Sequence, residues 1–184
     1  MTALPTNLTP GTWNFDALHS DFGFVARHAG ISKVRGEFTE FTGAISVADE
    51  FENSTVEAAA NVASITTGNE QRDGHLKSPD FFDIANHPTI TFRSTAAKLD
   101  GDELITTGDL TINGKAVPVE VVWEFGGIAQ DPWGNVKAGF EGKATISRKE
   151  WGLTWNAALE TGGVLISDKI KLVLEVEAAK KVEA

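Results

Sequence analysis

The chain has 184 residues, of which 41% are hydrophobic and 23% charged. This composition fits one folded domain with a full core and excludes a disordered chain. Its 16 lysines and arginines stand against 26 acidic residues, so the net charge of −10 argues against nucleic acid as a partner. The absence of cysteine excludes disulfides, thiolate nucleophiles and zinc–sulfur sites.

The first residues, MTALPTNLTPGTWNFD, do not combine a basic start with an apolar stretch, so they predict no signal peptide. No segment approaches eighteen consecutive apolar residues, so no membrane span is expected. With no other targeting signal in view, we expect a cytoplasmic location.

The first strands contain an irregularity. In VRGEFTEFTGAISV (34–47), the apolar residues up to Phe38 occupy even positions, whereas those from Phe41 onwards occupy odd positions. A change of parity inside one strand predicts a β-bulge near Thr39-Glu40, which bends the strand. A hairpin turning near residues 52–54 then leads into TVEAAANVASI.

The segment NEQRDGHLKSPDFFD (69–83) is more polar than its surroundings and predicts a short helix. Thr67 and Glu70 have the spacing of a capping box, and Asn69 is an alternative cap. Pro79 is expected to end the helix, because proline disfavours helical geometry at the preceding residue. A second short turn would then carry Phe81 and Phe82.

Turn sequences organise the second half of the chain into a meander. Asp100-Gly101, Asn113-Gly114 and residues 131–135 separate four alternating strands, and Asn-Gly and Asp-Gly favour two-residue hairpins. The last strand is expected to alternate from Val164 to Val176, which would span on the order of 40 Å at about 3.4 Å per residue. Long strands, bends and successive hairpins predict an all-β chain. Its fold would be an extended eight-stranded antiparallel up-and-down barrel, with one or two short helices at a barrel end.

Two polar groups invite a catalytic or metal-binding interpretation. His75 lies near Asp73, Asp80 and Asp83, but the pair of histidines at i and i+4 typical of a zinc helix is missing. We favour a solvated polar helix anchored by its apolar residues.

His19 and His28 are the second group. They would lie roughly 30 Å apart along one extended strand and could not share a metal ion. Structural roles are favoured for both, and His28 is placed near a barrel mouth, where it could meet a polar ligand group. No catalytic or metal-binding residue is predicted.

The inward faces of the predicted strands mix large and very small residues, such as Phe140 beside Gly142, or Leu110 and Ile112 beside Gly108. An eight-stranded barrel can be filled by side chains or can hold one small ligand. The many small residues favour an elongated apolar cavity. Its walls could include four tryptophans, although tryptophans that plug the barrel are the alternative: Trp13, Trp123, Trp151 and Trp155.

Five segments in the right order resemble the YceI-like polyisoprenoid-binding family: WNFDALHSDFGFVARHAGISKVRGEF (13–38), NEQRDGHLKSPDFFD (69–83), HPTITFRST (87–95), GDLTINGKAVPV (108–119) and ISRKEWGLTW (146–155). Together they make a specific match over nearly the whole chain, which is interpreted as one lipid-binding domain, residues 1–184, with a core of about 11–178. The family is similar to lipocalins in architecture, and its characterised members hold polyprenyl phosphates or isoprenoid quinones in a central tunnel. Many members carry a secretion signal.

The resemblance implies a soluble, non-enzymatic carrier that requires no cofactor and binds a long-chain isoprenoid. In that interpretation residues 69–83 form a lid, and Arg72 and His75 contact a polar or anionic head group. The alternative is a metal- or His/Asp-assisted enzyme acting on an apolar substrate. A homodimer is left open, because the outward Val122 and Val173 are too few to define a patch. The predicted ligand-binding residues are Phe24, His28, Phe38, Arg72, His75, Leu76, Phe81, Phe82, Phe92, Leu110, Ile112, Trp123, Phe140 and Trp155.

Overall fold

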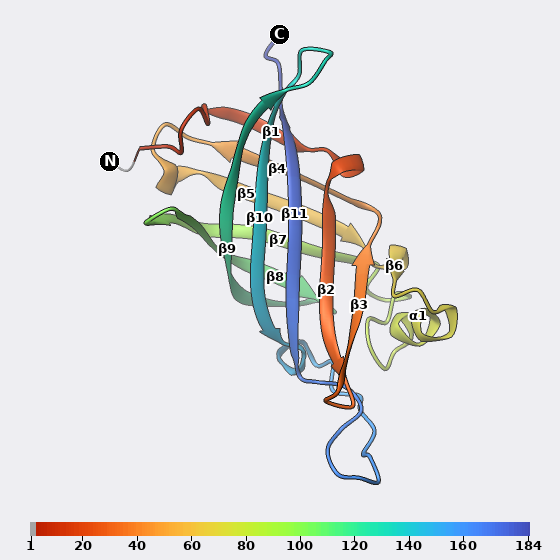
Figure 1. Ribbon diagram of the computed structural model, residues 1–184. Coiled ribbons are helices and arrows are strands. Elements are labelled where there is room, and N and C mark those ends of the chain that lie inside the picture. Colours follow the sequence, from red (N-terminus) through yellow and green to blue (C-terminus); the bar gives the residue numbers. More distant parts are fainter. Residues whose placement is uncertain (1–2) are drawn as a thin grey trace.

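The computed structural model describes residues 3–184 and shows a curved wall of antiparallel strands with one α-helix at its side (Figure 1). Among these residues, no helix is long and apolar enough to cross a membrane. In chain order the elements are β1 (Gly11–Phe15), η1 (Ala17–His19), β2 (Asp21–His28), β3 (Ser32–Phe38), β4 (Phe41–Val47), η2 (Phe51–Asn53), β5 (Thr55–Asn61), η3 (Val62–Ser64), β6 (Ile65–Thr66), α1 (Glu70–Lys77), β7 (Thr89–Asp100), β8 (Glu103–Ile112), β9 (Lys115–Gln130), β10 (Val136–Ser147), η4 (Arg148–Trp151) and β11 (Lys169–Lys180).

The strands close into a barrel. From β4 through β5, β7, β8, β9, β10 to β11, each strand pairs antiparallel with the next, and β1 closes the ring by pairing with both β4 and β11. Strand β2 pairs with β11 further along, at residues 171–175, where β1 no longer reaches. Strands β1 and β2 therefore act as one interrupted strand, as do β3 and β4. Counted this way the wall has eight positions, which confirms the predicted barrel.

The parity change at Thr39 and Glu40 is a break between β3 and β4, not the predicted β-bulge within one strand. The backbone leaves the ladder there, because the Asn61 N–H donates to the Glu40 carbonyl and the Thr39 N–H donates to the Ser64 carbonyl. Beyond the break, β3 pairs with only two residues of β6, and the chain then continues into α1. This break places α1 beside the half of the barrel that β2 and β3 enclose (Figure 1).

The predicted hairpin at Asn113-Gly114 is confirmed, whereas the turn predicted at Asp100-Gly101 is shifted by one residue. Asp100 pairs with Glu103 as the last residue of β7, so the turn consists of Gly101 and Asp102, of which only Gly101 has a positive φ. Strands β8 and β9 are joined by Asn113 and Gly114 alone, with φ values of 51° and 74°. Both values are positive, as a type I′ turn requires, and glycine adopts this region without steric cost.

The helix also ends where proline predicts, with Ser78 as its C-cap directly before Pro79. Its start is set by Asn69, whose side chain accepts from the Arg72 N–H, so the alternative cap is the correct one. Thr67 instead hydrogen-bonds to Asp73.

The prediction for the last strand is wrong at both ends. β11 covers Lys169–Lys180, whereas Val164 lies in a loop and is half exposed. The loop is held by the Asp168 carboxylate, which accepts from the Ser147 hydroxyl and from the Lys149 N–H. The even-numbered apolar pattern continued through this loop by coincidence, so alternation alone could not reveal the turn.

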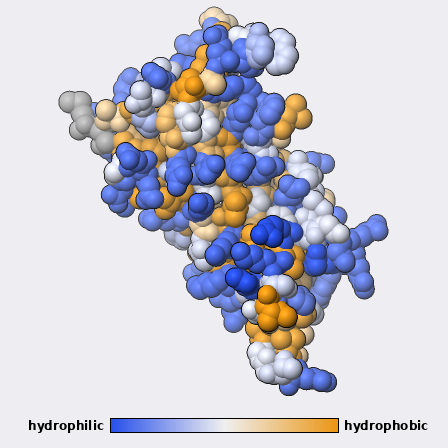
Figure 2. Space-filling view, in the orientation of Figure 1, coloured by the Kyte–Doolittle hydropathy of each residue, from blue (hydrophilic) through white to orange (hydrophobic). Residues whose placement is uncertain are grey.

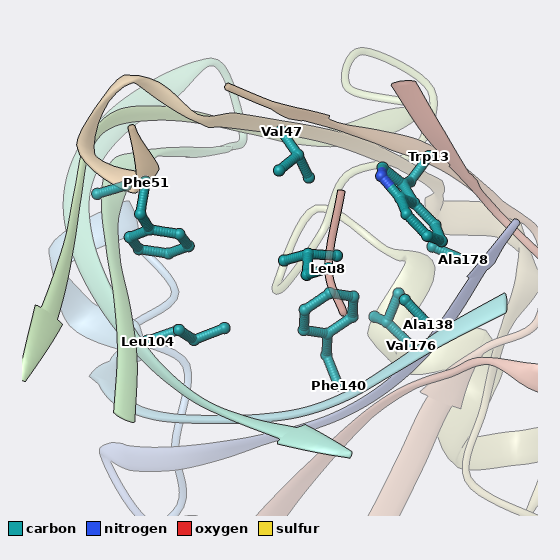
Figure 3. Close-up of a cluster of buried hydrophobic side chains, with 10 residues drawn as sticks. Leu8, Trp13, Val47, Phe51, Leu104, Ala138, Phe140, Val176 and Ala178 are labelled. Carbon is teal, nitrogen blue, oxygen red and sulfur yellow. The ribbon is translucent and has the colours of Figure 1, made fainter. Parts of the chain in front are cut away.

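The barrel interior has a packed end and an open half. At the packed end, side chains from opposite walls and from the N-terminal segment meet in the lumen: Leu8, Trp13, Val47, Phe51, Ala97, Leu104, Ala138, Phe140, Val176 and Ala178 (Figure 3). Trp13 is fully buried there and does not line the large cavity, so for this residue the plugging alternative is correct. A second buried cluster, which includes Phe81, Val121, Ile146 and Trp151, surrounds the open half.

Candidate functional site

A cavity of about 600 Å³ occupies the open half of the barrel. Its walls come from the inward faces of β2, β3, β5, β7, β8, β9, β10 and β11, and from α1 and the segments after α1 and η4. The volume lies within the range of small-molecule sites, about 300–1,000 Å³. Most of its lining is aliphatic or aromatic, so it suits an apolar ligand.

The structure brings thirteen of the fourteen predicted ligand-binding residues together around this cavity. The exception is Phe140, which points into the barrel as its parity predicts but belongs to the packed end and lines only a small void of about 50 Å³. Strand parity predicts which face is buried but not the height along the barrel. The thirteen are Phe24, His28, Phe38, Arg72, His75, Leu76, Phe81, Phe82, Phe92, Leu110, Ile112, Trp123 and Trp155.

Trp123 separates the two parts of the interior. It packs against both buried clusters and lines both the large cavity and the small void. Its indole N–H donates to the Thr106 hydroxyl at 2.9 Å, which fixes the ring on the neighbouring strand. The inner end of the cavity is therefore closed by a hydrogen-bonded tryptophan.

The segment 69–83 covers the cavity from the side of β6. Leu76, Phe81 and Phe82 line the cavity, and Phe81 is almost fully buried. The Asn113 amide donates to the Phe81 carbonyl at 2.7 Å and ties the segment to the β8–β9 turn. The predicted apolar underside of this segment is thus present.

The polar residues of α1 lie at the cavity rim. The His75 ring meets Trp155 edge to face at 4.6 Å between centroids, and its Nε2 lies 2.8 Å from an Asp80 carboxylate oxygen. The Arg72 guanidinium donates to the hydroxyl and the carbonyl of Thr67. Both candidate head-group residues are therefore held in defined positions beside the cavity.

Arg148 is a cavity-lining residue that the sequence analysis missed. It is only 4% exposed, and it donates to the carbonyls of Ser167, Leu153 and Trp155. Its Nη2 has no hydrogen-bond partner among residues 3–184, and burial lowers the pKa of its guanidinium. The signal was the inward parity of residues 138–146, which continues to position 148 with an arginine in place of an apolar residue.

The charged residues around the cavity all have one sign. Arg72 and Arg148 line it together with His28 and His75. Arg27 borders it from the outer face of β2, and within the described chain no aspartate or glutamate lines it. This is unexpected for a chain with a net charge of −10. Guanidinium groups bind phosphate and carboxylate well and also donate to neutral oxygens. The cavity therefore suits an apolar molecule with an anionic or oxygen-rich end.

A second polar cluster lies away from the cavity. The Lys137 ammonium is 2.6 Å from an Asp16 carboxylate oxygen and 3.4 Å from Glu177, and the His19 ring is 3.0 Å from Asp16. The hydrogen bond from Lys137, followed by that from His19, lowers the pKa of Asp16 to about 2. Asp16, His19 and Glu177 have the spacing of metal ligands, but the Lys137 ammonium already compensates their charge.

This cluster stabilises the barrel seam. It sits where β1 gives way to β2 on β11, and the Asp16 N–H donates to the Glu177 carbonyl at 2.8 Å. His28 takes no part in it and instead pairs with Ile166 at the other end of β2. The two histidines are separate, as the sequence predicted.

Comparison with known proteins agrees with this architecture. The model of the YceI-like domain matches residues 13–178. Protein YceI of Escherichia coli O157:H7 is 35% identical over 164 residues, which cover 89% of this chain and 83% of that protein.

Two solved structures share the fold. BcnA of Burkholderia cenocepacia has a TM-score of 0.76 at 22% identity, covering 89% of this chain and 98% of that one. A polyisoprenoid binding domain from Saccharophagus degradans has a TM-score of 0.66 at 15% identity, covering 94% and 100%. The family match over most of the barrel and the relative at 35% identity establish that this chain belongs to the YceI-like family.

Proposed function

We infer that the protein binds an isoprenoid-tailed lipid, a polyprenyl phosphate or an isoprenoid quinone, and acts as a carrier rather than as an enzyme. The observation that carries this inference is the apolar cavity of about 600 Å³ whose charged lining residues are all basic. The S. degradans neighbour is described as a polyisoprenoid binding domain, which supports the same class of ligand. A cytoplasmic location remains a prediction.

The tail would occupy the space between Trp123 and the mouth. Its burial would supply most of the affinity, at about 25 cal/mol per Å² of apolar surface removed from water. The polar end would lie near Trp155. Arg148 of η4 donates to the Trp155 carbonyl, and His75 of α1 packs against the Trp155 ring. A phosphate there would accept from guanidinium groups, and a quinone carbonyl would accept from the same donors.

The first experiment is native mass spectrometry of the purified protein, followed by organic extraction and identification of any bound molecule. We expect the mass of an isoprenoid quinone or a polyprenyl lipid. A protein that carries no such molecule and takes up no added geranylgeranyl monophosphate would refute the proposal.

The second experiment tests the head-group site by comparing geranylgeranyl monophosphate with geranylgeraniol, which has the same tail and a neutral end. Arg72→Ala and His75→Ala should weaken binding of the phosphate severalfold and leave the alcohol nearly unchanged. Arg93→Ala is the matched control, because Arg93 lies on the outer surface and pairs with Glu57. Equal losses for both ligands would show that these residues do not contact the head group.

Incubating the protein with either of these two lipids also distinguishes a carrier from an enzyme. A carrier returns the added lipid with its mass unchanged after incubation. Conversion of either lipid that depends on the His75–Asp80 pair would support the enzyme alternative instead.

A further inference from the structure

One end of the barrel, at which the cavity reaches the surface, has a surface unlike the rest of the molecule. Here the β2–β3 turn lies against the loop before β11: the Ala29 N–H donates to the Leu165 carbonyl, and the Ser167 N–H donates to the Arg27 carbonyl. We call residues 27–35 and 149–171 the tip. The exposed residues Arg27 and His28 belong to the tip and border the cavity, so the cavity reaches the surface there, as it also does beside the exposed Gln71 and Arg72 of α1.

The tip has the opposite charge to the remainder of the chain. It contains six lysines and arginines against three acidic residues, a net charge of +3. Since the whole chain carries −10, the remaining 152 residues carry −13. The separation of charge along the barrel is therefore strong.

Four of the six basic residues share one outer face. Arg27 and Lys33 are directly opposed across β2 and β3, and Arg35 and Lys171 flank Val25 on the same side of the sheet. Further from the tip the outward positions of these strands become acidic, with Glu37 on β3 and Glu175 on β11. Figure 2, in the orientation of Figure 1, shows this face: the deepest blue surface covers the lower halves of β2, β3 and β11.

This arrangement does not stabilise the isolated protein. Like charges directly opposite each other on a sheet are destabilising, and Arg27 and Lys33 form such a pair. Within residues 3–184, neither these two residues nor Arg35 and Lys171 form a salt bridge. An external anion would relieve the repulsion.

Exposed aliphatic side chains lie at the end of this basic face. Ile31 at the β2–β3 turn is 84% exposed, and Val164 in the neighbouring loop is 51% exposed. Hydrophobic surface lies beside and below the deep blue region at the lower end of Figure 2. Basic residues beside exposed aliphatic residues suit an interface of anionic head groups and acyl chains.

We propose that the tip docks onto the surface of an anionic phospholipid bilayer, so that the cavity mouth faces the membrane. Docking would allow the lipid to exchange between the bilayer and the cavity, and this role rests on the proposed function. The docking itself is inferred only from the charge and exposure of the tip. An exposed apolar residue alone is insufficient: Trp133 is equally exposed at the opposite end of the barrel, where β9 and β10 meet beside Asp131.

The test is co-sedimentation with vesicles made of equal parts phosphatidylglycerol and phosphatidylcholine, against vesicles of phosphatidylcholine alone. We expect binding to the anionic vesicles only, weakened by added salt. Lys33→Gln with Arg35→Gln should weaken this binding roughly 30-fold, because each basic residue near an anionic surface contributes about fivefold. Lys98→Gln with Lys181→Gln removes the same charge outside the tip and should change binding by less than about threefold.

A second pair of variants measures how much the exposed apolar side chains contribute to vesicle binding. Ile31→Ser should weaken vesicle binding severalfold, whereas Trp133→Ser should not. Binding that ignores lipid charge, or equal losses in the tip and control variants, would overturn the docking proposal.

A vesicle-free titration with farnesyl monophosphate keeps the two proposals distinguishable. Uptake of the probe without vesicle binding means that docking is wrong and the lipid site stands. Specific vesicle binding without uptake of any isoprenoid means that docking stands and the proposed ligand is wrong.

Discussion

The Trp123 indole lies directly over Gly142 on the neighbouring strand. A Cβ at position 142 would stand 2.5 Å from the ring, closer than side chains approach one another. Glycine at this position therefore allows the tryptophan to cross the lumen and close the inner end of the cavity.

Replacing Gly142 by alanine should destabilise the protein by about 1–3 kcal/mol, because overpacking forces Trp123 out of position. Urea unfolding measures the change. Gly139→Ala is the matched control, since a Cβ at position 139 on the same strand meets nothing within 4 Å. If both variants unfolded at the same urea concentration, the contact would not define the core.

The seam cluster predicts a pH dependence of stability. The pKa of Asp16 is lowered to about 2, chiefly by the hydrogen bond from Lys137. A carboxyl with a lowered folded pKa stabilises above its unfolded pKa, and this contribution is lost as the pH falls through the folded value. The contribution is on the order of 2 kcal/mol.

Asp16→Asn should therefore lower the free energy of unfolding at about pH 5 by that amount, and the difference from the wild type should shrink towards about pH 2. Denaturant titrations at several pH values test this prediction. Asp100→Asn, an exposed substitution on the β7–β8 hairpin, serves as control. A constant difference at all pH values would assign the effect of Asp16→Asn to something other than its charge.

Filling the cavity should abolish ligand uptake without unfolding the barrel. Ala58 lines the cavity from β5 and pairs with Phe92 on β7, so Ala58→Phe would extend into the empty space. Tryptophan fluorescence should report at least tenfold weaker binding of geranylgeranyl monophosphate. Ala129→Phe adds the same side chain at an exposed position of β9 and should bind normally. Unchanged affinity for Ala58→Phe would place the ligand outside the barrel.

Arg148 should contribute to stability as well as to the site. Its removal by Arg148→Met leaves the carbonyls of Ser167, Leu153 and Trp155 without their donor, and each unsatisfied buried group costs about 1–3 kcal/mol. We expect a loss of at least about 3 kcal/mol in the free energy of unfolding. Lys149→Met, at the next and exposed position, should change it little.

The Nη2 of Arg148, which has no hydrogen-bond partner in the part of the chain that the structure describes, predicts a further effect on the wild type. A ligand that pairs with the buried guanidinium stabilises the folded state, by about 2.7 kcal/mol at a concentration of one hundred times its Kd. Each ligand is added at a fixed concentration, the same multiple of its Kd at low salt, and Tm is measured at several salt concentrations. As the salt concentration is lowered, Tm should increase more with geranylgeranyl monophosphate than with geranylgeraniol, because only the phosphate pairs with the guanidinium charge. An identical response of both ligands to salt would mean that no charge pairing occurs.

The sequence by itself determined the strands and most of their turns, because these depend on local signals. Asn113-Gly114 requires a tight hairpin, alternation assigns Val119 and Val121 to the inner face, and the parity change at Thr39-Glu40 breaks a strand. Each of these signals acts over a few residues and is nearly independent of the rest of the chain.

Only the tertiary structure decided how high in the barrel each inward residue lies. Phe140 and Trp13 have the same inward character as Phe92 and Trp155, but they fill the packed end because β1 and the N-terminal segment meet them there. The start of β11 was also beyond the reach of alternation, since Asp168 makes its turn through contacts with Ser147 and Lys149.

The charge pattern of the site belongs to the tertiary structure for the same reason. Arg72 and Arg148 are far apart in a sequence whose net charge is negative, and they converge on one cavity only when the barrel closes. Strand alternation determines whether a side chain faces inward, but the side chains that surround one space are determined by register and closure, which are properties of the whole sheet.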